Sequence, residues 1–181
     1  MLLALSIASS QVRQPFCLNP AVITFRKKGN LRACKGWPGL IFSSSGQSSA
    51  LGDTPDTVVA YLPRNNVECT VTEGNGAQFQ WDVISDVSGY AQNLKYLTFI
   101  GGDQALVTIK NLDIQEETSC LVIKESYGNA FVPFLIPHYK NVYVIDPRHY
   151  KGTLSDFTAN NQVDDIIFLA NVLQGQQCIS C

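Results

Sequence analysis

One serine of the chain lies where a nucleophile could be presented. Ser126 follows the apolar run 120–123 after two charged residues, and Tyr127 and Gly128 come next. A serine at the end of a buried strand can expose its hydroxyl, and N–H groups of the following turn can bind the oxyanion that forms when it attacks a carbonyl. Serine also caps helices very often, and the local sequence alone favours that role. The nucleophile motif G-x-S-x-G is not met, because Lys124 stands in the place of its first glycine.

A serine nucleophile needs a base, usually a histidine that a carboxylate orients. The chain has two histidines, and the better placed is His149, three residues after Asp146. This pair could support Ser126, although an exposed loop histidine is the commoner case. Arg148 lies between them; it can brace the loop by pairing with Asp146 or bind an anionic ligand, and bracing is favoured.

Strand and helix patterns alternate in the second half of the chain. This order predicts an α/β fold with a mostly parallel sheet and helices on its faces. Ligands of such sheets bind beyond the carboxyl ends of the strands. Ser126 and the group Asp146, Arg148 and His149 each follow a predicted strand, so they are expected at the same edge. The predicted strands are 67–72, 96–100, 105–110, 120–124, 141–145 and 165–172, and the predicted helices are 129–139 and 153–161, the latter capped by Thr153 or Ser155.

The N-terminal segment 1–38 shows neither helical nor strand periodicity, and an irregular structure is expected for it. Residues 1–52 carry six basic residues and no acidic one, but they lack the interleaved aromatic residues of a nucleic-acid platform, so no nucleic-acid partner is predicted. The apolar start is at most a weak export signal, and no stretch is long enough for a transmembrane helix. The two cysteines of the C-terminal CISC are interpreted as tail thiols, and neither a metal nor a cofactor is predicted.

Four segments resemble the C-terminal half of the bacterial DHHW family, which is named for an Asp-His-His-Trp motif. They are SSSGQSSALGDTPDTVVAYLP, YLTFIGGDQALVTIKN, LVIKESYGNAFVPFLIPHYKNVYVIDPRHY and VDDIIFLANV. The resemblance covers about 39–175 and leaves 176–181 as a tail. DHHW proteins are similar to SGNH-type hydrolases and to alginate O-acetyltransferase-type proteins. The resemblance therefore implies a partial SGNH-like sandwich.

The resemblance changes the interpretation of Ser126. It makes this residue the family's nucleophile, with Tyr127, Gly128 and Asn129 in the turn that binds the oxyanion. However, the Asp-x-His-Trp segment that supplies acid and base in those relatives is not found in this sequence, and both histidines follow Ser126. One explanation is that the chain is a fragment whose segment 1–38 was read out of frame.

The function implied is that of a truncated esterase or O-acetyltransferase, outside the cytoplasm, whose substrate is an acyl ester of a cell-surface or exported carbohydrate. Without its acid and base the enzyme would be impaired. The alternative is a non-catalytic carbohydrate-binding or scaffold domain of the cell envelope. The sequence leaves the oligomeric state open.

Overall fold

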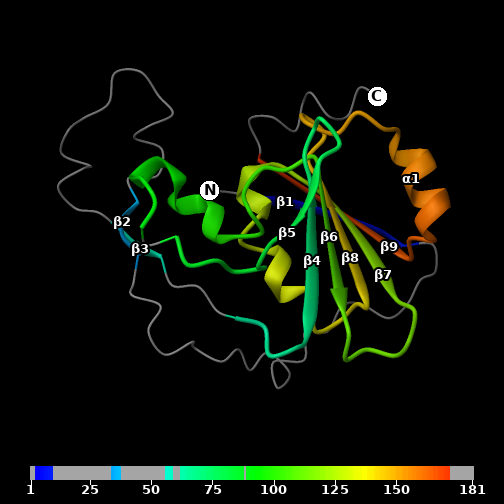
Figure 1. Cartoon of the computed structure of the whole chain (residues 1–181). Coiled ribbons are helices and arrows are strands. Elements are labelled where there is room, and N and C mark those ends of the chain that lie inside the picture. The colour runs from blue at the N-terminus through cyan, green and yellow to red at the C-terminus, as the bar shows by residue number, and fades with distance from the viewer. Residues whose placement is uncertain (1–2, 10–33, 38–55, 59–61, 88, 172–181) are drawn as a thin grey trace.

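A mixed sheet forms the centre of the molecule (Figure 1). The computed structural model describes residues 3–9, 34–37, 56–58, 62–87 and 89–171. Seven strands run in the order β1-β9-β7-β8-β6-β4-β5. Their bounds are β1 (Leu3–Ser9), β4 (Val67–Thr72), β5 (Gln78–Gln80), β6 (Leu106–Asn111), β7 (Ser119–Lys124), β8 (Asn141–Ile145) and β9 (Asp165–Asn171). A separate antiparallel pair consists of β2 (Cys34–Trp37) and β3 (Asp56–Val58).

The α/β class is confirmed, but the expectation of a mostly parallel sheet is wrong. Among the described strands, the parallel pairs are those that β7 forms with β8 on one side and with β9 on the other. The pairs β1–β9, β8–β6, β6–β4 and β4–β5 are all antiparallel. Parallel neighbours require a long crossover connection. The alternation of strand and helix signals begins only at β7, and the parallel pairing is confined to that part of the chain.

The two faces of the sheet carry separate apolar clusters. All six residues of β7 are buried, so its side chains alternate between two covered faces. Cys120 and Val122 pack in the larger cluster, whereas Leu121 and Ile123 pack with Phe157 of α1 (Leu154–Asn161). The hydroxyl of Thr153, one of the two predicted caps, caps α1 by accepting a hydrogen bond from the Asp156 N–H, 3.2 Å away. Figure 1 shows α1 on one side of the sheet.

The predicted helix over 129–139 is wrong. Two 3-10 turns cover this part of the chain, η4 (Ser126–Gly128) and η5 (Val132–Phe134). Backbone bonds there run to the third preceding residue, as from Leu135 to Val132 at 3.0 Å. Pro133 and Pro137 have no N–H to donate, so a continuous α-helical ladder cannot form across them. The apolar residues still cover one face of the sheet, with Val132 and Ile136 fully buried.

The predicted strand over 96–100 is wrong as well. The 3-10 helix η3 (Gln92–Thr98) takes its place, followed by an isolated bridge between Phe99 and Ile84. A strand here would have had to pair with β6, the next strand in the chain. Both edges of β6 are already occupied, one by β4 and the other by β8. The apolar side chains of this segment instead fill the larger core cluster.

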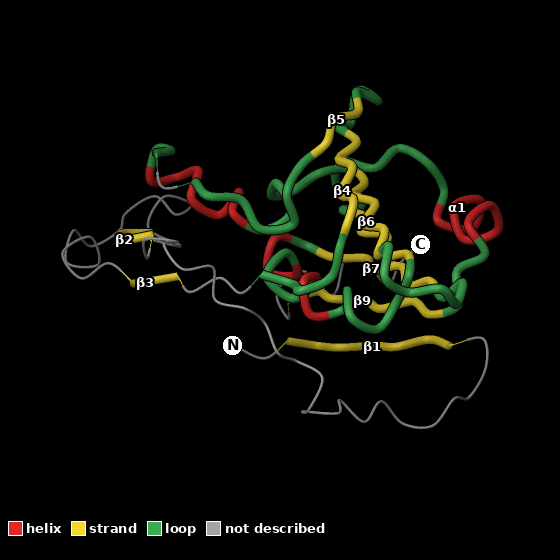
Figure 2. The backbone as a smooth tube through the Cα atoms, turned by 60° about the horizontal axis from the view of Figure 1, so that its bottom comes forward, coloured by secondary structure: helices red, strands yellow, loops and turns green. Residues whose placement is uncertain are grey.

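The N-terminal region differs in part from its prediction. Leu3–Ser9 and Cys34–Trp37 form strands where no regular structure was expected. Figure 2 shows β1 lying beside β9, with which it pairs in an antiparallel register that joins Leu3 to Asn171. The segment 10–33, the polar run 43–49 and the C-terminal CISC lie outside the described residues. Within the described ranges, every helix is too short or too polar to cross a membrane.

Candidate functional site

Four of the loops that connect the strands lie at the same edge of the sheet, where the carboxyl ends of β7 and β8 are. Ser126 follows the carboxyl end of β7, and Asp146 follows the carboxyl end of β8, its parallel neighbour. Because β6 runs antiparallel to β8 and pairs Leu106 with Ile145, the loop 103–105 reaches the same edge. The end of β4 pairs with Leu106 too, which brings the β4–β5 turn alongside. The sequence prediction that Ser126 and the Asp146 group share an edge is therefore confirmed.

Ser126 begins the 3-10 turn and does not cap it. The extended backbone of β7 continues through Glu125, whose N–H donates to the Leu169 carbonyl of β9 at 3.2 Å. Glu125 occupies the N-cap position, and the turn has no side-chain cap. Ser126 itself is half-buried. The Ser126 hydroxyl thus does not cap a helix, and the capping role that the local sequence favoured for this residue is wrong.

The turn uses some of the N–H groups that an oxyanion would need. The Gly128 N–H donates to the Glu125 carbonyl at 2.8 Å, and the Asn129 N–H donates to the Ser126 carbonyl at 3.2 Å. The Tyr96 hydroxyl also donates to the Ser126 carbonyl. Among the described residues, the N–H groups of Ser126 and Tyr127 donate no hydrogen bond. Of the three residues expected to bind the oxyanion, Tyr127 is thus the one whose backbone N–H is not used within the turn.

Gly128 is required by close packing. A Cβ at this position would lie 2.6 Å from the Cβ of Lys124 and 3.4 Å from a terminal carbon of Leu169. Contacts as short as 2.6 Å do not occur between real side chains, and the Lys124 Cβ is fixed to a central strand. The absence of a side chain at Gly128 thus lets the turn fold back directly onto β7.

A buried charge network lies beside this turn. Lys124 is 2% exposed, and its ammonium lies 3.2 Å from Asp103 Oδ1 and 3.6 Å from Asp146 Oδ2. Burial lowers the pKa of Lys124, and the two carboxylates oppose that effect. The amide of Asn129 donates to the same Asp103 oxygen at 2.9 Å. Asp103 therefore joins the end of β7 to the third residue after Ser126.

Arg148 closes the network from the loop after β8. Its Nε and Nη2 donate to the two oxygens of Asp146 at 2.9 and 2.5 Å, and Nη2 also donates to Asp103 at 2.8 Å. Burial alone would raise the pKa values of both carboxyls, but contacts with Arg148 and Lys124 outweigh it and leave them below their ordinary values. Asp146 is fully buried and charged. The bracing contact expected between Arg148 and Asp146 is present.

His149 does not reach Ser126 through a hydrogen bond. Its N–H donates to the Asp146 carbonyl at 3.0 Å, which fixes the loop, while its side chain is exposed. Within the described part of the chain, neither its ring nor the Ser126 hydroxyl makes a side-chain hydrogen bond. The Asp146 carboxylate is engaged by Arg148 and Lys124 and so does not orient the imidazole. The structure places His149 on the edge of the site, without the contacts of a triad.

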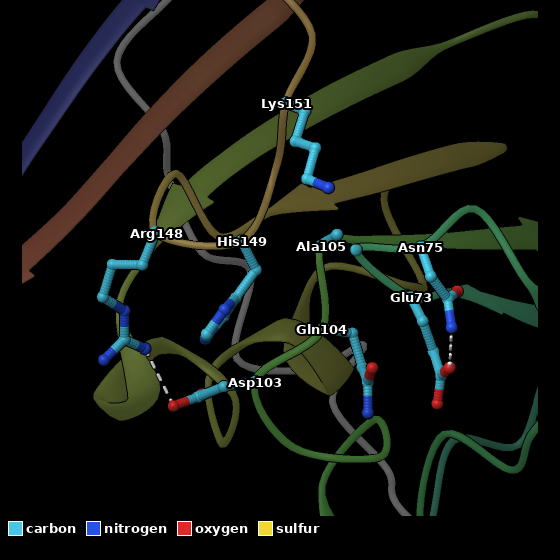
Figure 3. A pocket seen from close by; sticks show the side chains of 9 residues that line it. Glu73, Asn75, Asp103, Gln104, Ala105, Arg148, His149 and Lys151 are labelled. Carbon is cyan, nitrogen blue, oxygen red and sulfur yellow. Dashed lines mark hydrogen bonds and ion pairs between the residues drawn. The ribbon is translucent and has the colours of Figure 1, made fainter.

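A polar cleft of about 410 Å³ lies next to this network, on the side of β8, β6 and β4 (Figure 3). Figure 3 shows the loop after β8 on one side and the β4–β5 turn on the other, with the loop before β6 between them. A Cβ on Gly74 would lie 3.3 Å from the His149 carbonyl oxygen, so the two walls nearly touch there. Ser126 is not among the lining residues, which are Glu73, Gly74, Asn75, Asp103, Gln104, Ala105, Arg148, His149 and Lys151.

Comparison with protein families matches residues 39–145, more than half of the chain, to the DHHW protein family. The chain belongs to the DHHW family. The match contains β4, β6, β7, β8 and the Ser126 turn, and it ends one residue before Asp146. No relative is found among curated proteins.

Two proteins are among the solved structures that resemble this DHHW chain. A DHHW family protein from Eubacterium siraeum is 28% identical with a TM-score of 0.59, over 67% of this chain and 40% of that protein. Bacillus cereus PatB1, solved both with a sulfonyl adduct and without it, is 26% identical with a TM-score of 0.54. The matches with PatB1 cover 63% and 65% of this chain and 41% and 40% of PatB1. The chain thus spans about two fifths of the length of these proteins.

Sequence reasoning missed the residues that hold the site together. Lys124 carried a signal, because a lysine that directly continues a buried aliphatic strand needs a charged partner. Its partner Asp103 precedes it by 21 residues and gave no sign of the pairing. Tyr96 was assigned to a strand, and only the 3-10 conformation of its segment brings its hydroxyl to the Ser126 carbonyl.

Proposed function

We propose that Ser126 is the nucleophile of a DHHW acyl-transfer site that acts on acyl esters of a carbohydrate outside the cytoplasm. The observation that carries this proposal is the position of Ser126 at the carboxyl end of β7, half-buried, free of a capping role and next to the Tyr127 N–H. Family membership and the sulfonyl adduct of PatB1 support it, because sulfonyl reagents form adducts with nucleophilic side chains.

The reaction would proceed in two balanced steps. The Ser126 oxygen attacks the acyl carbonyl, loses its proton and forms an acyl-serine, while the alcohol of the donor leaves with a proton. Water or a sugar hydroxyl then attacks the acyl-serine, which returns Ser126 and yields either a carboxylic acid or a new sugar ester. The Tyr127 N–H would stabilise the oxyanion in both steps.

The rate depends on a base that this sequence does not place before Ser126. No Asp-x-His-Trp segment occurs in it, and His149 is held by the Asp146 backbone and not by a carboxylate. A serine without a base is a weak nucleophile. Loss of a triad member lowers kcat by a factor on the order of 10⁴ or more. We therefore expect acylation of this chain to be slow.

Labelling with a fluorophosphonate tests the proposal. A folded sample is incubated for hours with excess reagent, and the adduct is located by mass spectrometry. Slow single-site labelling is expected, lost in Ser126→Ala and retained in Ser155→Ala, which removes an exposed hydroxyl from α1. Labelling that persists at the same site and rate in Ser126→Ala would refute the assignment of the nucleophile.

A second candidate function is carbohydrate binding without catalysis. The polar cleft favours it, because most of its lining residues are polar or charged and Ser126 is not among them. A folded sample that binds saccharides but takes up no fluorophosphonate over a day would favour this function over the enzyme.

A further inference from the structure

The polar cleft has the size of a ligand site, and most of the residues that line it have polar or charged side chains. Its volume of about 410 Å³ lies in the range of small-molecule sites. Ala105 is the only aliphatic residue of its lining, and no Phe, Tyr or Trp is among the lining residues. An acyl chain would therefore gain little by entering it. What fits is a hydrophilic ligand such as the saccharide portion of an ester.

Most acceptor groups of the cleft are already engaged. Asp103 Oδ1 receives Lys124 and Asn129, and its Oδ2 receives Arg148. On the opposite wall, Glu73 Oε2 accepts from the Asn75 amide at 3.2 Å. The Asn75 Oδ1 in turn accepts from the Ala77 N–H at 2.8 Å. A ligand that needed to donate hydrogen bonds would have to compete with these internal contacts.

Fewer of the hydrogen-bond donors of the cleft are engaged in contacts within the protein. Arg148 directs Nε and Nη2 to Asp146 and Asp103, which leaves Nη1 of a side chain that is 41% exposed. Lys151 is exposed, and among the described residues it forms no ion pair. Figure 3 shows its ammonium extending from the loop after β8 towards the middle of the cleft. With His149 between them, two cations and one imidazole ring line a single wall.

We propose that the polar cleft binds an anionic saccharide, whose carboxylate or phosphate pairs with Lys151 and Arg148. Charge-assisted hydrogen bonds from these groups are the strong contacts available here. The cleft includes Asp103, which is bonded to the Ser126 turn through Asn129, and it extends across two strand spacings from β8 to β4, roughly 10 Å. A saccharide bound in this way would place one of its own ester or hydroxyl groups near Ser126. Only this last step rests on the proposed function.

Calorimetric titration with three probes tests the proposal. They are a short oligosaccharide of hexuronic acids, the same oligosaccharide with its carboxyl groups reduced to alcohols, and a phosphorylated oligosaccharide of neutral hexoses. At least one anionic probe is expected to bind, at least tenfold more tightly than the reduced one, and more weakly as NaCl rises from 0.05 to 0.3 M. Whichever anionic probe binds identifies the source of the charge. Binding of neither anion, or equal binding of the reduced probe, overturns the proposal.

Variants assign the effect to the cleft. Lys151→Gln should weaken binding about tenfold, the loss of one charge-assisted contact, and Lys151→Arg should restore it. Lys110→Gln is the matched control, because Lys110 is an exposed lysine at the opposite end of β6, paired with Asn141. Equal affinities of the Lys151→Gln and Lys110→Gln proteins would overturn the proposal. Ser126→Ala should bind like the wild type, so failure of fluorophosphonate labelling and failure of binding can be told apart.

Discussion

Replacing Lys124 by methionine tests whether the buried charge network holds the site. Methionine keeps an unbranched apolar stem of similar length but removes the ammonium. In the wild type this group lies 3.2 Å from Asp103 and 3.6 Å from Asp146, and its side chain is 1% exposed. The substitution leaves both carboxylates with Arg148 as their remaining cation.

The expected loss of stability follows from these distances. At an effective dielectric constant of about 20, an ion pair at 3.2 Å is worth roughly 5 kcal/mol before desolvation is subtracted. Removing one member of a buried pair typically costs about 3–5 kcal/mol, because the partner stays buried without compensation. Since Arg148 still contacts both carboxylates, we expect a loss near the lower limit, about 3 kcal/mol.

Urea unfolding at pH 7 measures this loss from the transition midpoint at constant slope. The double variant Lys124→Met, Asp103→Asn should recover part of the stability, because it removes one of the stranded charges. Lys110→Met serves as the control and should change stability by less than about 0.5 kcal/mol, as surface substitutions do. A loss below about 1 kcal/mol for Lys124→Met would refute the claim that this network stabilises the site.

Two further predictions concern the same region. Gly128→Ala should destabilise the chain by about 1–3 kcal/mol, because its Cβ would lie 2.6 Å from the Lys124 Cβ, whereas Gly89→Ala, which meets nothing within 4 Å, should be close to neutral in the same urea assay; equal effects of the two would contradict the packing argument. The folded pKa values of Asp103 and Asp146 lie below their unfolded values, so their stabilisation is present above about pH 4 and is lost as pH falls through the folded pKa values. When urea midpoints are measured from pH 6 down to pH 3, the midpoint should decrease as the pH drops below about 4, and it should decrease less steeply in Asp146→Asn. An identical pH dependence in that variant would be evidence against a stabilising role of the Asp146 carboxylate.

Local patterns located most of the central strands. The predicted boundaries of 67–72 and 141–145 coincide with β4 and β8, and α1 begins after the predicted cap Thr153. Short β-branched runs between turn residues are a strong signal for a strand. Segment 96–100 has the same composition but forms part of a 3-10 helix and a bridge, because β6 offers no free edge to it. The composition of a segment gives it a preference for the extended conformation, whereas its pairing in a sheet depends on which neighbouring strands still have a free edge.

The candidate site divides in the same way. The order of strand and helix signals was sufficient to predict that Ser126 and Asp146 lie at one edge of the sheet. It could not show that Asp103 bridges them, because the contact joins residues separated by the whole of β6. Nor could it show that the Asp146 carboxylate pairs with Arg148 and does not orient the His149 ring, since this depends on how the loop after β8 folds.

By itself, the sequence determined the class of the fold, the central strands, the family and the serine at the end of β7, because each depends on residue type and on neighbours close in the chain. The tertiary structure alone decided the sheet's mixed pairing, the 3-10 turn that frees Ser126 from a capping role, and the partners of Lys124. These depend on contacts between distant segments. A charged side chain or a strand edge pairs with whichever partner the whole fold brings within reach, and residues close in the sequence do not determine which partner that is.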